Sequence, residues 1–372
     1  MRFAHLTRLC LPFAAAFLVT GCLDDGGSSG GDDTNSGRIH YLGVSGLSYQ
    51  TASQSGTTDG QGRFRYYPGE TLSLRVGNLP IIEDVSAQEY VTFLEFLPET
   101  REPLQSPGVD DEALRDHRLI EEQQFGNTTL LNMTRFLMAL NWSQFVAEDQ
   151  GIDIRPRVIT QLNAALSDPN LPDSIDFTVN QADFTAEDSP VNRLLAAICF
   201  YPEDNVLCSE PPTDDEINSA PPRPENDEDI DPEVTYSEDL ESLRDRILQA
   251  VRQIEDADNE RARTYLRREL NAISREVARR YFLADHKANH PASDTTIKTI
   301  QIRRIGGAPS LAQLEAISKR EQDVVIHSWD WQDADVDYFV AGSAGGESEL
   351  LINFRPANTY RWVRKQIRVI ID

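Results

Sequence analysis

The chain has 372 residues, of which 40% are hydrophobic, enough to build a sizeable core in two or three domains. Its 61 acidic residues outnumber 35 Lys and Arg and give a net charge of −26, which opposes binding to nucleic acid and to anionic lipid headgroups. Beyond the N-terminal segment no apolar run approaches the roughly 20 residues that cross a bilayer, which excludes a channel or a permease.

The first residues have the features of an export signal. Two arginines precede an apolar run over 9–19 that is too short to span a bilayer. The sequence VTGC (19–22) resembles the lipobox of bacterial lipoproteins, in which an aliphatic residue and two small residues precede a cysteine. The resemblance implies removal of a signal peptide (1–21) and lipidation of Cys22, with palmitate among the expected acyl groups. The alternatives are an ordinary cleaved signal and a chance cysteine beside a cytosolic N-terminus.

Residues 22–37 are expected to form a flexible tether. Gly and Ser keep this segment flexible and four Asp keep it solvated, with a reach of about 20 Å. In lipoprotein sorting an Asp after the lipidated cysteine favours the inner membrane, so Leu23 favours the outer one. We therefore expect a lipid-anchored protein of the bacterial envelope, in the outer membrane and facing the periplasm or the cell surface.

Residues 38–100 predict a small antiparallel β-sandwich. Phe64 and Tyr66 alternate with polar residues, and a second alternating run covers 71–76. Pro68-Gly69 between the two runs predicts a type II turn, because Pro presets the first central residue and Gly accepts the positive φ of the second.

The stretch GLSYQTASQSGTTDGQGRFRYYPGE (46–70) resembles a module of uncharacterised proteobacterial lipoproteins and surface proteins with the pattern GLSYxTxSxxGxTDxxGxFxYxPGE. Its TDxxGxF core is also similar to prealbumin-like β units labelled carboxypeptidase-regulatory-like. The resemblance implies a non-catalytic β module and names no ligand. Some relatives are labelled organic solvent ABC transporter permease, which the lack of spanning segments in this chain contradicts.

Residues 101–208 are expected to form a helical layer against this module. In the same family the module commonly continues into a helix and an acidic loop suited to calcium. Here residues 134–154 keep the helix but place Asn-Trp-Ser-Gln (141–144) where acids would stand, and three acids remain further on. Calcium prefers six or more oxygen ligands, so we expect no calcium at this loop.

Cys199 and Cys208 are expected to form a disulfide. An isolated pair nine positions apart in an oxidising periplasm is typical of a structural bond, which would contribute about 2–3 kcal/mol by closing a small loop. The alternatives are a redox pair or a metal pair. Redox motifs usually space the thiols more tightly, and neither a further cysteine nor a nearby histidine completes a metal site.

Residues 209–235 combine six prolines and ten acids with one arginine, a composition that predicts an unordered, solvated spacer. An acidic binding tail is the functional alternative.

Residues 236–290 predict a long helix or a helical hairpin, bent over 255–260 where apolar residues are lacking. Its second half carries seven arginines. We expect this basic face to meet acids of the protein's own surface, with the acidic surface of a protein partner as the alternative.

Residues 295–372 predict a second antiparallel sandwich, with SLAQLEAISK (310–319) as a helix or turn. In the last segment, Val363, Ile367, Val369 and Ile371 fall on one face of a strand, which suggests that the C-terminus is pinned into the sheet.

Three groups of residues resemble ligand sites without completing them. His286 and His290 are four apart, near the expected helix end, but Lys287 stands where a HExxH motif has Glu. The segment 333–337 begins like a calcium loop, yet its sixth position is tyrosine, where the turn needs glycine. The tryptophans at 329 and 331, with an aspartate between them, have the chemistry to stack a sugar ring, but we expect them to be buried in the sandwich.

Together these patterns predict an α+β fold with an N-terminal sandwich, a helical middle and a C-terminal sandwich. The predicted function is a membrane-anchored envelope lipoprotein that acts as a binding or structural module, with the lipid membrane and a protein docked on the helical region as partners. The alternatives are an accessory subunit of an envelope transport system and a hydrolase with an unrecognised site. No catalytic residue, metal ligand or cofactor is predicted, and no nucleic-acid partner.

Overall fold

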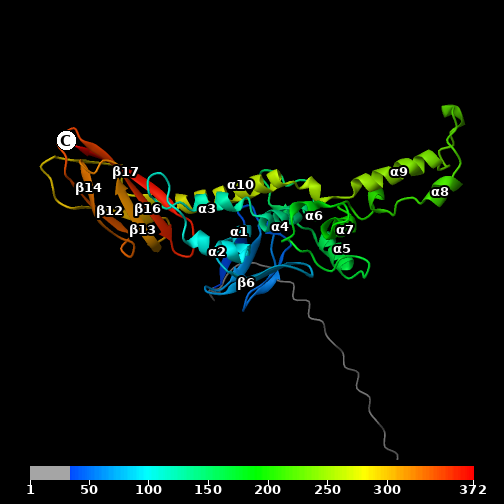
Figure 1. Ribbon diagram of the computed structural model, residues 1–372, viewed down its shortest axis with the longest axis horizontal. Coiled ribbons are helices and arrows are strands. Elements are labelled where there is room, and N and C mark those ends of the chain that lie inside the picture. The colour runs from blue at the N-terminus through cyan, green and yellow to red at the C-terminus, as the bar shows by residue number, and fades with distance from the viewer. Residues whose placement is uncertain (1–33) are drawn as a thin grey trace, which may run out of the picture. The chain divides into compact units, whose positions relative to one another are not determined.

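The computed structural model describes residues 34–372, whose helices and strands are drawn in Figure 1. The expected signal peptide, Cys22 and most of the expected tether lie outside the described residues. Helices and largely antiparallel sheets occupy separate regions, as the α+β prediction requires, with a sheet region at each end and a helical middle. Within the described part, none of the helices combines the length and the apolar character that crossing a membrane requires.

The N-terminal module contains two small sheets. Its strands are β1 (Asn35–Ile39), β2 (Val44–Ser45), β3 (Ser48–Gln50), β4 (Ser55–Thr57), β5 (Arg63–Tyr66), β6 (Thr71–Val76), β7 (Leu79–Ser86) and β8 (Tyr90–Val91). The sheets have the orders β5-β1-β8 and β4-β3-β6-β7, and their neighbours are antiparallel except for β1 and β8. Between β5 and β6, the N–H of Glu70 donates to the carbonyl of Tyr67 and Gly69 has a φ of 89°, as the predicted turn requires.

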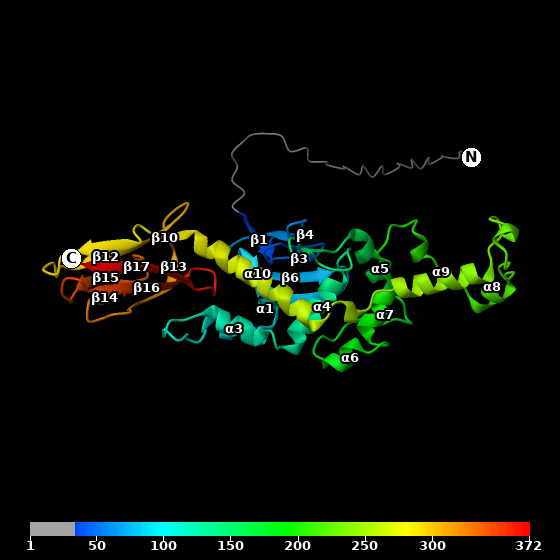
Figure 2. The ribbon, with the colours of Figure 1, turned by 90° about the horizontal axis from the view of Figure 1, so that it is seen from above.

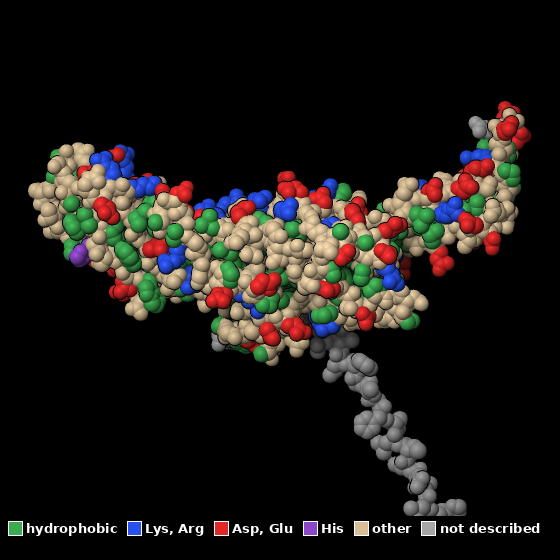
Figure 3. Space-filling view, in the orientation of Figure 1, with side chains coloured by type: hydrophobic (Ala, Val, Ile, Leu, Met, Phe, Trp, Pro, Cys, Tyr) green, Lys and Arg blue, Asp and Glu red, His purple; other side chains and the backbone are tan. Residues whose placement is uncertain are grey.

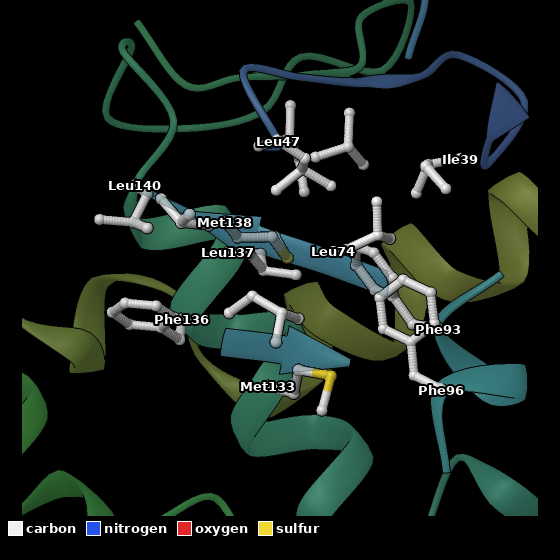
Figure 4. Packing of buried hydrophobic residues seen from close by; sticks show 14 of the residues in the cluster. Ile39, Leu47, Leu74, Phe93, Phe96, Met133, Phe136, Leu137, Met138 and Leu140 are labelled. Carbon is white, nitrogen blue, oxygen red and sulfur yellow. The ribbon is translucent and has the colours of Figure 1, made fainter. Parts of the chain in front are cut away.

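A layer of short helices covers this module. It comprises α1 (Phe93–Phe96), α2 (Pro98–Gln105), α3 (His117–Gln124), α4 (Thr128–Ala139), α5 (Pro156–Leu166), α6 (Gln181–Thr185), α7 (Pro190–Ala196) and the 3-10 turn η1 (Val206–Cys208). A two-residue strand, β9 (Ile152–Asp153), pairs in parallel with β2. Sheet and helices share one apolar core, in which Leu74 of β6, Phe93 of α1 and Leu137 of α4 are buried (Figure 4).

The expected unordered spacer over 209–235 is instead folded against its neighbour. It contains α8 (Asp214–Ser219) and the 3-10 turn η2 (Asp227–Asp229), and α8 contacts α9 (Ser237–Ala250). Ile217 is buried, and Asp214 Oδ1 lies 2.6 Å from Arg244 Nη1. The composition predicts that the segment cannot fold alone, but α9 supplies the surface on which it orders. Acidic side chains still dominate this end of the molecule (Figure 3).

The helix predicted over 236–290 is divided and ends earlier. The 3-10 turn η3 (Ile254–Asp256) separates α9 from α10 (Asn259–Arg279), near the predicted bend. Residues after 280 form the strands β10 (Tyr281–Leu283) and β11 (Lys287–His290). The helical expectation is wrong there because β12 and β17 offer unpaired edges, and backbone pairing with those strands outweighs local propensity.

The C-terminal part is a sandwich of two four-stranded sheets, as predicted. Its further strands are β12 (Lys298–Arg304), β13 (Leu311–Ser318), β14 (Val324–Asp330), β15 (Asp335–Val340), β16 (Glu347–Pro356) and β17 (Val363–Ile371). The sheets have the orders β10-β12-β15-β14 and β11-β17-β16-β13. The four apolar residues predicted to share a face of the last strand are all buried. The edge strand β11 joins β17 in parallel, an exception to the antiparallel pattern.

Segment 310–319, expected as a helix or turn, forms strand β13. Its Leu, Ala, Gln and Glu residues favour helices in isolation. However, β13 pairs antiparallel with β16 along its whole length and buries Leu311, Leu314 and Ala316. A register shift between Leu311 and Gln313 accounts for the spacing of three between the two buried leucines, which imitates a helical period.

Helix α10 belongs to both apolar cores of the described unit. Tyr265 and Leu266 lie in the core shared by the N-terminal module and the helical layer, whereas Ile273 and Val277 lie in the core of the C-terminal sandwich. The helix is about 31 Å long, and it runs from the side of α4 past the N-terminal strands to β10 (Figure 2). One rigid element therefore connects the two halves of the unit.

A buried carboxylate fixes α10 to the N-terminal module. Glu269 Oε2 accepts hydrogen bonds of 2.8 Å from the backbone N–H groups of Tyr41 and Leu42. Glu269 Oε1 accepts from Arg268 Nε at 3.0 Å and from Arg268 Nη2 at 2.8 Å. The side chain of Glu269 is wholly inaccessible to solvent, so these four donors are all that compensates its burial.

We predict that Glu269→Ala lowers the free energy of unfolding by about 3–5 kcal/mol, because two partly buried backbone N–H groups and one guanidinium lose their acceptor. Chemical denaturation checks this. Glu260→Ala is the matched control: that carboxylate is largely exposed, lies 3.6 Å from Arg263, and its loss should change stability by less than about 1 kcal/mol. Equal effects of the two substitutions would contradict the anchoring role.

Candidate functional site: two clefts at a buried polar junction

The connection between β16 and β17 inserts three large side chains among the helices. Tyr360, Arg361 and Trp362 are all buried, and Tyr360 belongs to the core of the N-terminal half. The backbone N–H of Trp362 donates to His117 Nδ1 at 3.0 Å, so the start of α3 receives this connection directly. The junction is therefore built from residues more than two hundred positions apart.

Arg361, Tyr360 and Glu121 form a chain of buried polar groups. Arg361 Nη2 donates to Tyr360 Oη at 3.0 Å, and Tyr360 Oη donates to Glu121 Oε1 at 2.8 Å. Burial raises the pKa of Glu121 to about 7, although the charge of Arg361 opposes the shift. The Tyr360 hydroxyl has a pKa well above its ordinary value, also because of burial, so it remains a donor.

Two further titratable groups are buried at the same junction. Burial lowers the pKa of His40 to about 3, so its ring is neutral, and its Nε2 accepts from the N–H of Phe93 at 3.1 Å. Burial raises the pKa of Glu95, whose carboxylate accepts from the N–H and the hydroxyl of Thr92 and from the amide of Gln88. Both groups are sealed from solvent and therefore serve structure rather than proton exchange with a ligand.

Beside this chain, Ser274, His117 and Asp116 meet in the order of a catalytic triad. Ser274 Oγ lies 2.9 Å from His117 Nε2, and His117 Nδ1 lies 3.8 Å from Asp116 Oδ1. The three residues line a cleft of about 510 Å³, named here the His117 cleft. Its wall also carries five arginines: Arg115, Arg118, Arg268, Arg275 and Arg364.

The hydrogen bonds of His117 are arranged opposite to those of a serine hydrolase. Its Nδ1 accepts the N–H of Trp362, so in the neutral ring Nε2 carries the proton and donates to Ser274. A triad requires the reverse, with Nδ1–H donated to the carboxylate and Nε2 free to take the serine proton. Burial, reinforced by Arg361, also lowers the pKa of His117 to about 3, which makes it a weak base. Asp116 instead forms an ion pair with Arg118, with 2.5 Å between Asp116 Oδ2 and Arg118 Nη2.

A second cleft opens where the N-terminal module, the end of α10 and the C-terminal sandwich meet. This Arg280 cleft also has a volume of about 510 Å³. Its charged wall residues are Glu89, Arg280, Arg304 and Arg361. Arg280 Nη1 and Nη2 donate to both oxygens of Glu89 at 2.9 and 2.6 Å, and these ion pairs raise the pKa of Arg280 further. The remaining wall is mostly hydroxyl and amide groups: Asn35, Ser36, Tyr66, Tyr90, Tyr281, Ser310, Asn358 and Thr359.

Of the residues singled out from the sequence, the two cysteines behave as predicted. Cys199 and Cys208 form a disulfide with their Cα atoms 5.5 Å apart. It closes the loop between α7 and η1, next to the segment that leads into α8. The lipidation residue Cys22 lies outside the described residues.

The segment after α4, where we expected no calcium, is held by hydrogen bonds from two arginines. Arg252 donates to the carbonyl of Ala139 at 2.8 Å, and Arg268 donates to those of Ala147 at 2.8 Å and Gln150 at 3.0 Å. Guanidinium groups thus satisfy the carbonyl oxygens on both sides of this loop. In the described part of the chain, no group of three or more His, Cys, Asp or Glu side chains is placed to hold a metal ion.

Two expectations about other residues are corrected. His290 lies on β11 rather than at a helix end, and its Nε2 is 2.8 Å from Tyr338 Oη, so its partner is the sandwich. Trp329 and Trp331 are not buried but are 48% and 45% exposed. They lie at the end of β14, an edge strand, where no neighbouring strand covers them.

The six arginines of α10 and Arg280, which follows it, are mostly paired with acids of the protein itself, as expected. Basic and acidic side chains alternate along this face (Figure 3). Acids lie within 4.0 Å of Arg261, Arg263, Arg267, Arg268, Arg279 and Arg280. Among the described residues, Arg275 has no such acid, and its Nε donates to the carbonyl of Asn271 at 3.3 Å.

The clefts and the polar junction were not found from the sequence. Glu121 and Ser274 are ordinary residues of amphipathic helices, and Arg361 stands between two aromatic residues at the start of a strand. The flanking aromatic pair is a signal of burial around Arg361, but its partners are far away in the chain.

Comparison with known proteins adds little. The chain matches no protein-family model and no curated protein. One similar solved structure is that of domains 4 and 5 of the S-layer protein SbsC, at 9% identity and a TM-score of 0.19. The match covers 24% of this chain and half of the length of that one, and at this level of similarity it supports no functional argument.

We predict that Glu121 makes the protein less stable as the pH rises from 4.5 through 7. The folded state keeps a proton that the unfolded state loses in this range, because the pKa is about 7 when folded and 4.5 when exposed. Relative to wild type, Glu121→Gln should gain about 3 kcal/mol of unfolding free energy between pH 4.5 and 8, measured by denaturation.

Glu122→Gln is the control for this measurement. Its ion pair with Arg267 lowers the pKa of Glu122, so wild-type stability from this group is lost as the pH falls. The two variants should therefore deviate from wild type in opposite directions. If the unfolding free energy of Glu121→Gln relative to wild type did not change with pH, this carboxyl would not be buried as described.

We predict that Ser274 is not a nucleophile. A fluorophosphonate probe should leave Ser274 unlabelled, and the imidazole of His117 should not titrate between pH 5 and 8 in NMR spectra, because its pKa is about 3. Labelling that disappears in Ser274→Ala would instead establish a hydrolase.

Proposed function

We propose that the protein is a lipid-anchored module of the bacterial envelope that acts by binding. The observation that carries the binding role is the Arg280 cleft, a polar hollow of about 510 Å³ with three arginines and one acid in its wall. Ligand sites commonly measure about 300–1,000 Å³ and use a few convergent polar groups. In a chain with a net charge of −26, such a basic hollow is a local exception.

The anchoring role is supported by the VTGC sequence and the flexible, acidic segment that follows it. A lipid on Cys22 would hold the protein at a membrane, and the tether would let the folded unit stand off the surface. The resemblance of residues 46–70 to a module of envelope lipoproteins supports the same placement.

A hydrolase is disfavoured by a specific observation. The Ser274–His117 contact has the proton on the wrong nitrogen, and the acid of the apparent triad is engaged by Arg118. Binding therefore accounts for the clefts better than covalent catalysis does.

We predict that Cys22→Ala moves the protein from the membrane fraction to the soluble periplasmic fraction and abolishes labelling by palmitate. Cys10→Ala is the matched control, because Cys10 belongs to the segment that would be removed, and it should change neither result. Membrane fractionation of cells that express the full chain checks this. Wild-type protein without acyl label, or Cys22→Ala protein that stays in the membrane, would refute the anchor.

A further inference from the structure

The starting observation is a buried arginine that lacks an ionic partner. Arg361 is 1% exposed, yet within the described part no carboxylate oxygen lies within 4.0 Å of its guanidinium. Its side chain donates to Tyr360 Oη, and its Nε has no hydrogen-bond partner. Burying a charge without a counterion is strongly unfavourable, so such a group usually faces an anion.

Two buried acids, Glu121 and Glu95, interact electrostatically with Arg361, but neither lies within 4.0 Å of its guanidinium. Burial raises the pKa of Glu121 to about 7 and raises the pKa of Glu95 as well. Glu121 is therefore partly uncharged near neutral pH, and the guanidinium keeps a positive potential at the junction.

Arg361 and Arg304 both line the Arg280 cleft. Arg304, at the end of β12, makes neither an ion pair nor a side-chain hydrogen bond with the other described residues. Arg280 forms an ion pair with Glu89, the one acid among the residues that line the cleft. The net charge of the side chains in the wall is therefore positive.

Three tyrosines complete the wall with neutral hydroxyl groups. Burial raises the pKa of Tyr66, Tyr90 and Tyr281, so each phenol remains protonated at neutral pH and can donate a hydrogen bond. Their rings also present flat apolar surfaces. This combination suits a ligand that carries both an anionic group and several hydroxyl groups.

We propose that the Arg280 cleft binds a small hydroxyl-rich anion, a sugar that carries a carboxylate or a phosphate. Arg304 and Arg361 pair with its anionic group, and the tyrosine, serine and asparagine side chains of the wall bond its hydroxyls. The inference rests on the proposed binding function and specifies its ligand class. Because the wall comes from the N-terminal module, α10 and the C-terminal sandwich, an occupant would also join the two halves.

The test is calorimetry on the full chain in detergent with glucuronate, glucose 6-phosphate and glucose as probes, at low ionic strength where charge pairing is strongest. The two anions should bind, and glucose should bind at least tenfold more weakly. An acidic oligosaccharide released from the envelope serves as a further probe and distinguishes a free sugar anion from the end of a glycan.

Arg304→Gln should weaken anion binding by about tenfold, because it removes one charge-assisted pair from an exposed position. Arg303→Gln is the matched control: Arg303 precedes Arg304 on β12 and is exposed, but it is outside the cleft wall, so binding should stay within twofold of wild type.

Binding by the monosaccharide anions, or by the acidic oligosaccharide alone, supports the proposal and identifies the source. Equal binding of glucose and glucuronate, the absence of binding by every probe, or equal losses in the two arginine variants would overturn it. The anchor is judged separately by fractionation: Cys22→Ala should keep the anion affinity, and Arg304→Gln should stay in the membrane fraction.

Discussion

The architecture depends on one helix, α10, whose two halves each bury a face in a different apolar core. The first half of α10 packs into the core of the N-terminal half, and the second half packs into the sandwich. Its rotation and register are fixed by Glu269, whose carboxylate accepts hydrogen bonds from two backbone N–H groups of the N-terminal module. Because a buried acceptor that loses its donors is costly, slippage of α10 is opposed by more than apolar packing. Because α10 contributes residues to both clefts, this constraint also positions part of each wall.

The junction brings together several titratable groups whose pKa values are shifted by burial. His40 and His117 are held neutral, and both act as hydrogen-bond acceptors for backbone N–H groups. Ser274, His117 and Asp116 therefore resemble a triad in position while their protons are arranged for structure. The guanidinium of Arg361 differs from these groups, since it keeps its charge, its Nε has no hydrogen-bond partner among the described residues, and Arg361 is one of the residues that line the Arg280 cleft. This contrast favours a role in binding an anion over a role in cleaving a bond.

Local patterns predicted those elements whose sequence period matches their environment. The strands β5, β6 and β17 and the turn at Pro68-Gly69 follow from alternation and turn chemistry. Errors occurred where pairing outweighed propensity, as in β13, which contains helix formers, and in β11, which adds to an open edge. The tryptophans of the β14 end were expected inside the sandwich, but exposure depends on the position of β14 at the edge of its sheet.

The sequence by itself determined the α+β class, the order of the sheet and helical regions and the disulfide, because these depend on residues close together in the chain. Tertiary structure alone decided the polar junction and its clefts. Arg361 meets Glu121 through Tyr360, and Ser274 meets His117, across separations that no local period encodes. The same holds for α8, which has too few apolar residues to fold alone and orders on the surface of α9. The physical reason is that charge pairing and burial are properties of neighbours in space, and the chain brings these neighbours together only in the folded structure, where α10 joins its two cores.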